Sequence, residues 1–204
     1  MAGGPGDDTL DGGSGTDFVT YQRTRQAIAA DLSRLQVTGD GSDNLVRIEG
    51  VVGSAYDDTL VGDTGPNFFR GRRGDDKIIG GRGDDSLDGG EGVDTVSYKD
   101  VERPISVDLA TEMATGQGRD SLLSIEDVIG SNHRDVITGN SLDNVLYGRG
   151  GADTLSGLAG RDSLYGGPGG DRLLGGTGSD ILRGGPGKDR CRPGTGSNAL
   201  RSCG

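Results

Sequence analysis

The stretch "GGPGGDRLLGGTGSDILRGGPGKDRCRPG" at residues 166–194 repeats a nine-residue unit, Gly-Gly-x-Gly-x-Asp-x-U-x, in which U is a large apolar residue. Glycine loses more backbone entropy on folding than any other residue, so a folded segment this rich in glycine needs another interaction to offset that cost. Position 6 is Asp in twelve copies and Asn in three, and position 8 is Leu, Ile, Val or Phe in all copies but one. The fifteen frames begin at residues 3, 12, 53, 62, 71, 80, 89, 130, 139, 148, 157, 166, 175, 184 and 193.

The repeats fall into three arrays, at residues 3–20, 53–97 and 130–201, separated by inserts at residues 21–52 and 98–129. The inserts resemble each other at an offset of 77 residues, since Tyr21, Asp31, Asp43, Ile48 and Glu49 recur as Tyr98, Asp108, Asp120, Ile125 and Glu126. This match indicates a duplicated structural unit rather than a pair of disordered spacers. We therefore expect one solenoid over residues 1–204, in which the inserts form longer, less regular rungs.

The composition limits what kind of protein this is. The chain has 42 Gly among 204 residues, 30% hydrophobic residues, 4% aromatic residues and a net charge of −11. Low hydrophobicity with high net charge is typical of a chain that is disordered unless something bound to it drives folding. The acidic balance argues against a nucleic-acid partner, whose phosphates would be repelled. No window approaches the ~20 apolar residues of a membrane span.

The spacing predicts an all-β fold. Nine residues are too few for a unit that contains a helix, whereas the x-U-x triplet suits a short strand that points one side chain inward and its two neighbours outward. Two loop-strand units would make one turn of a parallel β-roll, a two-sheet β-solenoid whose strands stack at ~4.8 Å. The position-6 carboxylates of successive turns would then repel one another unless a cation lay between them. Calcium fits such loops better than magnesium, because it accepts six to eight oxygens that include backbone carbonyls.

Copies such as "GGPGDDTLD" (3–11), "GGRGDDSLD" (80–88) and "GGTGSDILR" (175–183) resemble the calcium-binding nonapeptides of RTX, or haemolysin-type, repeat proteins. The inserts also resemble stretches that interrupt such arrays in secreted bacterial proteins. The resemblance implies several Ca²⁺ ions, each between loops two repeats apart, with Asp carboxylates bridging neighbouring sites and loop carbonyls completing each shell. Asn67 and Asn144 offer only a neutral oxygen, so their sites are expected to be weaker, and Asn198, in the last copy, is expected to have no following loop with which to share an ion. The metal ligands that the resemblance implies are Asp8, Asp17, Asp58, Asn67, Asp76, Asp85, Asp94, Asp135, Asn144, Asp153, Asp162, Asp171, Asp180 and Asp189.

The two cysteines, Cys191 and Cys203, lie near the C-terminal end of the chain. Cys191 takes the inward position 8, so it is either a small core residue or half of a disulfide with Cys203. We favour the disulfide, which would close the last turn and indicates an oxidising compartment. RTX proteins exported by one-step secretion are typically poor in cysteine, so this feature departs from the family pattern.

Three further features have competing interpretations. The triplets Arg73-Gly74-Asp75 and Arg82-Gly83-Asp84 match a cell-adhesion motif, but the repeat pattern already accounts for their Gly and Asp. Glu49 and Glu126 are calcium ligands at the insert–array junction, partners for nearby arginines, or surface charges. Asp43 and Asp120 give only a weak calcium-loop signal.

No catalytic constellation is present: the single histidine, His133, is expected to be a surface residue, and no GxSxG, P-loop or GxGxxG motif occurs. We expect a monomeric, extracellular, non-enzymatic bacterial module that binds calcium and folds with it. The opening "MAGGPGDD" enters the repeat pattern at once, so we expect the chain to be a piece of a larger secreted enzyme or toxin, or its export signal to lie elsewhere. Alternatives are a stand-alone structural or adhesive surface element, and a solenoid that recognises sugar or ice, for which the outward positions show no regular ladder.

Overall fold

The computed structural model describes residues 1–204, and all of its regular structure is β, in twenty-three strands of which most are three residues long. The chain forms no helix that is long and apolar enough to span a membrane. The residues divide into two compact units, one of residues 1–96 with 118–125 and the other of residues 97–117 with 126–204. The prediction of an all-β roll with parallel sheets is confirmed, whereas a single continuous solenoid over the whole chain remains a prediction.

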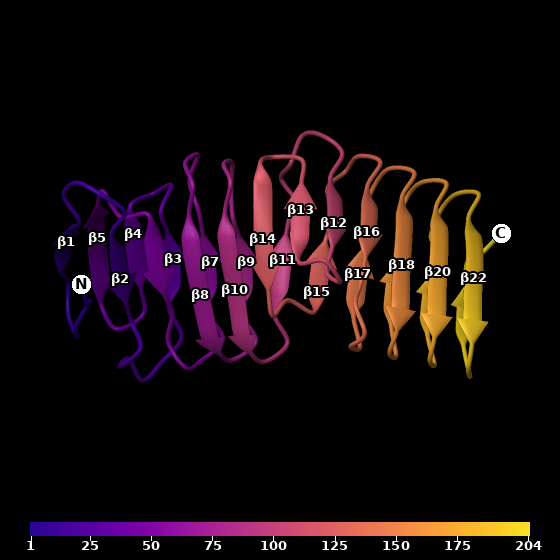
Figure 1. Cartoon of the computed structure of the whole chain (residues 1–204), viewed down its shortest axis with the longest axis horizontal. Helices are drawn as coiled ribbons and strands as arrows, with labels where there is room; N and C mark the ends of the chain where they lie inside the picture. Colours follow the sequence, from indigo (N-terminus) through magenta and orange to yellow (C-terminus); the bar gives the residue numbers. More distant parts are fainter. The chain divides into compact units, whose positions relative to one another are not determined.

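The first unit contains two sheets (Figure 1). One runs in the order β1-β5-β4-β3-β7-β9-β11 and the other in the order β2-β6-β8-β10-β14. The strands are β1 (Thr9–Asp11), β2 (Phe18–Thr20), β3 (Ala29–Asp31), β4 (Gln36–Thr38), β5 (Ser42–Val46), β6 (Gly50–Val52), β7 (Thr59–Val61), β8 (Phe68–Arg73), β9 (Lys77–Ile79), β10 (Ser86–Glu91), β11 (Thr95–Ser97) and β14 (Arg119–Leu123).

The second unit also contains two sheets, in the orders β15-β17-β19-β21-β23 and β13-β12-β16-β18-β20-β22. In Figure 1 the strands β16, β18, β20 and β22 lie side by side in chain order, from orange to yellow. The strands are β12 (Ser106–Asp108), β13 (Met113–Thr115), β15 (Asp127–Ile129), β16 (Val136–Thr138), β17 (Val145–Tyr147), β18 (Thr154–Ala159), β19 (Ser163–Tyr165), β20 (Arg172–Thr177), β21 (Ile181–Arg183), β22 (Arg190–Thr195) and β23 (Ala199–Arg201).

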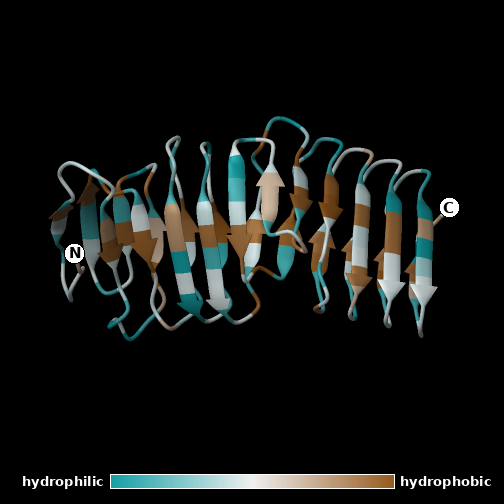
Figure 2. Cartoon of the chain, in the orientation of Figure 1, coloured by the Kyte–Doolittle hydropathy of each residue, from teal (hydrophilic) through white to brown (hydrophobic).

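The x-U-x triplets form the strands, and their middle residue forms the core. Leu146 pairs with Leu164 and Leu164 with Leu182, all in parallel register and all fully buried. Partners lie 18 residues apart, so one turn of the coil consumes two nonapeptides, as the spacing predicts. Figure 2 shows the hydrophobic colour mainly on the strands, while most connecting loops are white or teal. Each turn therefore buries only a thin apolar layer, which makes the loops important for stability.

The inserts add antiparallel strands to otherwise parallel sheets. In the first unit β3 pairs with β4 and β4 with β5, and in the second unit β12 pairs with β13. The turns contain Leu35 and Glu112 at equivalent places, both with positive φ (59° and 57°). Each insert also supplies ordinary core residues, such as Ile28 and Leu32 in the first unit and Ile105 and Leu109 in the second.

The predicted disulfide is confirmed. Cys191 in β22 is bonded to Cys203, with a Cα–Cα distance of 5.7 Å. The last strand, β23, is exposed along its whole length, and Leu200 is 48% exposed. The bond therefore ties down a terminal turn that has little apolar burial of its own.

We expect Cys191→Ser to destabilise the last turn by about 3 kcal/mol, because the 12-residue separation between the cysteines leaves a short loop whose closure entropy the disulfide removes from the unfolded state. Hydrogen exchange in saturating calcium is the appropriate measurement, and faster exchange should be confined to residues near 181–201. Exchange in this segment equal to that of the wild type would contradict the stabilising role assigned to the bond.

Glycine at position 1 of the repeat allows the position-6 side chain and a carbonyl oxygen of the next turn to approach the backbone closely. A Cβ added at Gly166 would lie less than 3.0 Å from both Asp171 Oδ2 and the carbonyl oxygen of Gly184. At Gly170, in the same loop, the nearest atom would be the carbonyl oxygen of Lys188 at 3.6 Å, an ordinary contact.

Gly166→Ala should therefore destabilise the folded chain by about 1–3 kcal/mol, the usual cost of overpacking. Gly170→Ala should change the free energy of unfolding by less than about 0.5 kcal/mol. Urea unfolding of both variants in saturating calcium tests this, and equal effects would show that the contact at position 1 does not govern the choice of glycine.

Candidate metal-binding loops

The position-6 side chains form ladders inside each unit. In the second unit, the Asp135, Asp153 and Asp171 amides donate to Oδ1 of Asp153, Asp171 and Asp189 at 2.8, 2.9 and 2.9 Å. A parallel ladder joins Asn144, Asp162, Asp180 and Asn198 in the same way. In the first unit, Asp58 is joined to Asp76, and Asp76 to Asp94. The structure thus stacks the predicted ligands in register, one every 18 residues.

Most of these side chains are buried. From Asp58 to Asp189 every predicted ligand is at most 3% exposed, whereas Asp8 and Asp17 are half-buried. Asn198 also joins its ladder, since its Oδ1 accepts the amide of Asp180 at 2.7 Å.

The hydrogen bonding of the second carboxylate oxygen, Oδ2, indicates what these loops can bind. In seven ladder residues Oδ1 accepts the amide of the previous turn, but Oδ2 is buried and has no hydrogen-bond partner: Asp76, Asp85, Asp153, Asp162, Asp171, Asp180 and Asp189. Asp17 Oδ2 is likewise buried without a partner. A buried, unpartnered carboxylate oxygen costs several kcal/mol unless a proton or a cation compensates it.

Backbone carbonyls converge on the same places. The space beside Gly148 is flanked by Asp153 Oδ2 and the carbonyl oxygen of Gly166, and Gly157 has the same relation to Asp162 and Gly175. The carbonyl oxygens at positions 2 and 4 also face the next turn, as those of Gly167 and Gly169 do at Gly185 and Gly187. The loops thus bring together several oxygens, of which only one or two per turn are charged.

Burial raises the pKa of these carboxyl groups. Desolvation, reinforced by neighbouring aspartates, raises the pKa of Asp76, Asp85 and Asp153 to about 7, and that of Asp162 to about 6. The hydrogen bonds from the preceding turn act in the opposite direction but are outweighed. Without a cation, the folded loops therefore favour protonated carboxyl groups.

This donor set fits calcium. Calcium binds six to eight oxygen ligands in flexible geometry, and mixed carboxylate and carbonyl shells are common. No group of three or more His, Cys, Asp or Glu side chains is arranged to hold a metal ion. A calcium ion in these loops would therefore take most of its ligands from the backbone, and the Asp Oδ2 atoms would supply the negative charge.

Comparison with known families agrees with this geometry. The family model described as the RTX calcium-binding nonapeptide repeat matches residues 1–21, 52–87, 61–96, 129–164 and 165–200, more than half of the chain. The chain belongs to this family. Calcium binding is the property that the family implies, and the chain consists of RTX repeats with no catalytic domain evident. A comparison with curated protein sequences gives no significant match.

Two ladder positions lie outside the RTX frames that the sequence pattern identifies. Asp43 accepts the amide of Asp8 at 3.0 Å, and Asp120 accepts the amide of Asp85 at 3.3 Å; both are buried. Asp43 Oδ2 also accepts the hydroxyl of Tyr21 at 2.7 Å, and burial with this hydrogen bond raises the Tyr21 pKa. The signal was present in "TGDGSDNLV" (38–46) and "TGQGRDSLL" (115–123), which keep Gly-x-Gly-x-Asp-x-Leu but are out of phase with the nine-residue frame.

Glu49 has a structural role of the same kind, because its Oε2 accepts the amide of Asp17 at 2.9 Å. The aspartates of the two Arg-Gly-Asp triplets also accept hydrogen bonds within the fold. Asp75 accepts the amide of Val93 at 2.8 Å, and Asp84 accepts that of Arg119 at 2.9 Å. His133 is exposed, as expected, and its backbone amide donates to Ser131 Oγ.

The raised pKa values predict how the calcium-free chain responds to pH. The ordinary value is 3.8, so between about pH 4 and pH 7 the folded state holds protons that the unfolded state has released. The contribution of these groups to stability is therefore complete below about pH 4 and is lost as the pH rises towards 7.

In chelator, we expect far-UV circular dichroism to show more β structure at about pH 5 than at about pH 8, because protons replace the missing cation. Added calcium should remove most of this difference by supplying charge compensation at the higher pH. A metal-free chain that instead loses structure on acidification would contradict this account of the loops.

Proposed function

We propose that the chain is a calcium-dependent folding module of a secreted bacterial protein. In a cytoplasm with little free calcium the calcium-binding repeats stay disordered, and calcium at extracellular concentrations orders them. Extracellular calcium modules bind at about 10⁻⁴–10⁻³ M, which suits such a switch. Binding to the folded state alone stabilises it by mass action.

The observation that carries this proposal is the set of buried Oδ2 atoms without partners. The apolar core is too thin to offset them, since each turn adds only one inward side chain per strand, such as Leu155 in β18 and Leu164 in β19. Removing calcium would leave stacked like charges in a dry groove, and their repulsion opposes stacking of the turns.

We propose Asp76, Asp85, Asp153, Asp162, Asp171, Asp180 and Asp189 as the principal calcium ligands, with Asp17 and Asp94 in equivalent frames. These residues lie at position 6 of frames whose loop carbonyls face the same gap between turns. Two observations support a secreted setting. RTX repeats are typical of secreted bacterial proteins, and the disulfide between Cys191 and Cys203 suits an oxidising extracellular compartment.

A calcium titration followed by far-UV circular dichroism tests the proposal, with magnesium as the control ion. We expect a cooperative gain of β structure with calcium and none with magnesium, which requires a tighter octahedral shell. A chain already fully β in excess chelator at neutral pH would overturn the folding switch.

A matched pair of variants tests the ligand assignment. Asp171→Asn removes a buried ladder charge and should move the calcium midpoint to higher concentration. Asp100→Asn removes a charge of the same sign whose side chain is 82% exposed, outside any loop of the array, and should leave the midpoint unchanged. Equal midpoints in the two variants would contradict the role of Asp171.

A further inference from the structure

The loops fall into two classes according to the backbone torsion φ of their position-2 residue. In open loops this residue has positive φ, as at Gly167 (100°), Gly176 (110°) and Gly185 (102°), and Oδ2 of the position-6 Asp has no partner. In closed loops the φ is not positive, and the position-2 amide donates to the position-6 side chain of the same loop. The four closed loops that begin the second and third arrays are residues 53–58, 62–67, 130–135 and 139–144.

In closed loops, donors of the same loop bond the position-6 side-chain oxygen that has no hydrogen-bond partner in open loops. The Ser54 amide donates to Asp58 Oδ2 at 2.6 Å, and the Ser54 hydroxyl donates to Oδ1 at 2.7 Å. Ser131 makes the same contacts with Asp135, at 2.7 and 2.8 Å. None of the position-6 side chains of these four loops has a buried oxygen without a partner.

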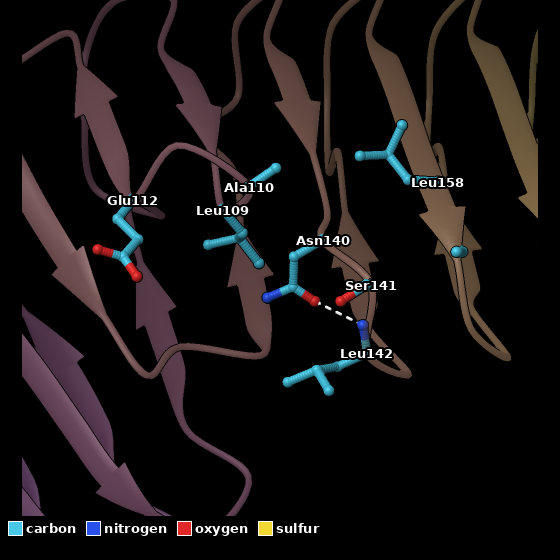
Figure 3. A pocket seen from close by; sticks show the side chains of 8 residues that line it. Leu109, Ala110, Glu112, Asn140, Ser141, Leu142 and Leu158 are labelled. Atoms are coloured by element: carbon cyan, nitrogen blue, oxygen red, sulfur yellow. Dashed lines mark hydrogen bonds between the residues drawn. The ribbon is translucent and has the colours of Figure 1, made fainter.

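The other two closed loops carry Asn in place of Asp. The amides of Asp63 and Asn140 donate to Oδ1 of Asn67 and Asn144 at 2.9 and 2.8 Å. Figure 3 shows Asn140 turned back onto its own loop, where its Oδ1 accepts the amide of Leu142 at 2.8 Å. A loop that keeps its conformation with a neutral amide does not depend on a cation to neutralise a carboxylate.

The closed loops occupy corresponding places in the duplicated sequence, since Ser131 and Asn140 follow Ser54 and Asp63 by 77 residues. Each pair directly follows an insert and is bonded to it: Asp58 Oδ1 accepts the amide of Ile28, and Asp135 Oδ1 that of Ile105. On its other side each closed loop meets an open one, through the amide of Asp58 to Asp76 and of Asp135 to Asp153.

An arginine side chain donates a hydrogen bond to the first closed loop. Arg72 Nη1 donates to the position-2 carbonyl oxygen of Ser54 at 3.1 Å. Arg72 has a φ of 97°, and Arg149, 77 residues later, has a φ of 75°. Positive φ at a non-glycine residue costs about 1–3 kcal/mol, so the open conformation persists here despite an unfavourable backbone.

We infer that calcium occupies the open loops and that the four closed loops hold none of their own. Each closed pair, packed on its insert, is a metal-independent platform that is ordered before calcium arrives and on which the open turns stack when it binds. This inference rests on the proposed function, because it assigns that function's calcium sites to one class of loop.

The first experiment is hydrogen exchange on the full chain at neutral pH, in chelator and then in saturating calcium. In chelator we expect protection at residues 28–38, 53–70, 105–115 and 130–147, and fast exchange at residues 150–200. Calcium should then protect the latter segment. If calcium orders the chain but the closed loops exchange as fast as the open ones in chelator, only this inference fails. If calcium orders nothing, the proposed function fails.

The second experiment counts bound calcium by native mass spectrometry in two double variants. Asp58→Asn with Asp135→Asn changes closed loops to the residue that Asn67 and Asn144 already carry, and the wild-type count should be kept. Asp76→Asn with Asp153→Asn makes the same change one turn later and should lower the count. Loss of ions in the first variant, or no loss in the second, would overturn the assignment.

A third variant pair tests the platform itself. Ser54→Ala with Ser131→Ala removes the hydroxyl donors and should speed exchange of the closed loops in chelator about tenfold, as expected when a buried acceptor loses its partner. Ser86→Ala with Ser163→Ala, at outward strand positions, should not. Unchanged exchange in the first pair would contradict the capping role of these serines.

Discussion

The buried carboxylate oxygen that faces the next turn is the constraint on which the rest of the structure depends. Stacking strands at the spacing of a β-sheet superposes every loop, so one Asp per nonapeptide becomes a column of like charges in a groove closed to water. Oδ1 is stabilised by the amide of the neighbouring turn, as at Asp153 and Asp171, but Oδ2 is not. A cation, a proton or a local donor must compensate it, and the sequence uses the glycines to leave room for a cation.

Glycine contributes in two separate ways. At position 1 it permits close approach, because any side chain at Gly166 would overlap Asp171 and Gly184. At position 2 it permits positive φ, which keeps the amide of Gly167 away from the carboxylate and directs it to the carbonyl oxygen of Gly184 at 2.9 Å. Where position 2 is Ser, Asp or Asn and φ is not positive, the amide donates to the side chain at position 6. A single backbone torsion therefore decides between an open loop and a closed one.

The weak points of the repeat array are stabilised without metal. Beside the inserts, the serine hydroxyls of the closed loops donate to the carboxylates of Asp58 and Asp135. Near the N-terminal end, the Tyr21 hydroxyl donates to Asp43 in the same way. At the C-terminal end, where β23 is exposed, a disulfide replaces the missing apolar burial. Hydrogen bonds and a covalent bond thus stabilise the turns beside the inserts and the turn that contains the exposed strand β23.

The sequence alone determined the repeat, its register and the chemistry of its loops. A period of nine with one inward residue admits short parallel strands and little else, and stacked Asp residues in glycine-rich loops indicate calcium. Tertiary structure decided the rest. Asp43 and Asp120 join the ladders although they are out of phase, because their strands β5 and β14 pair in parallel register with β1 and β10. The division into open and closed loops depends on φ at position 2, and Arg72 and Leu158 adopt the open conformation without being glycine. The reason is physical: periodicity is a local property of the chain, whereas the torsion at position 2 and the partner of Oδ2 depend on what the neighbouring turn presents.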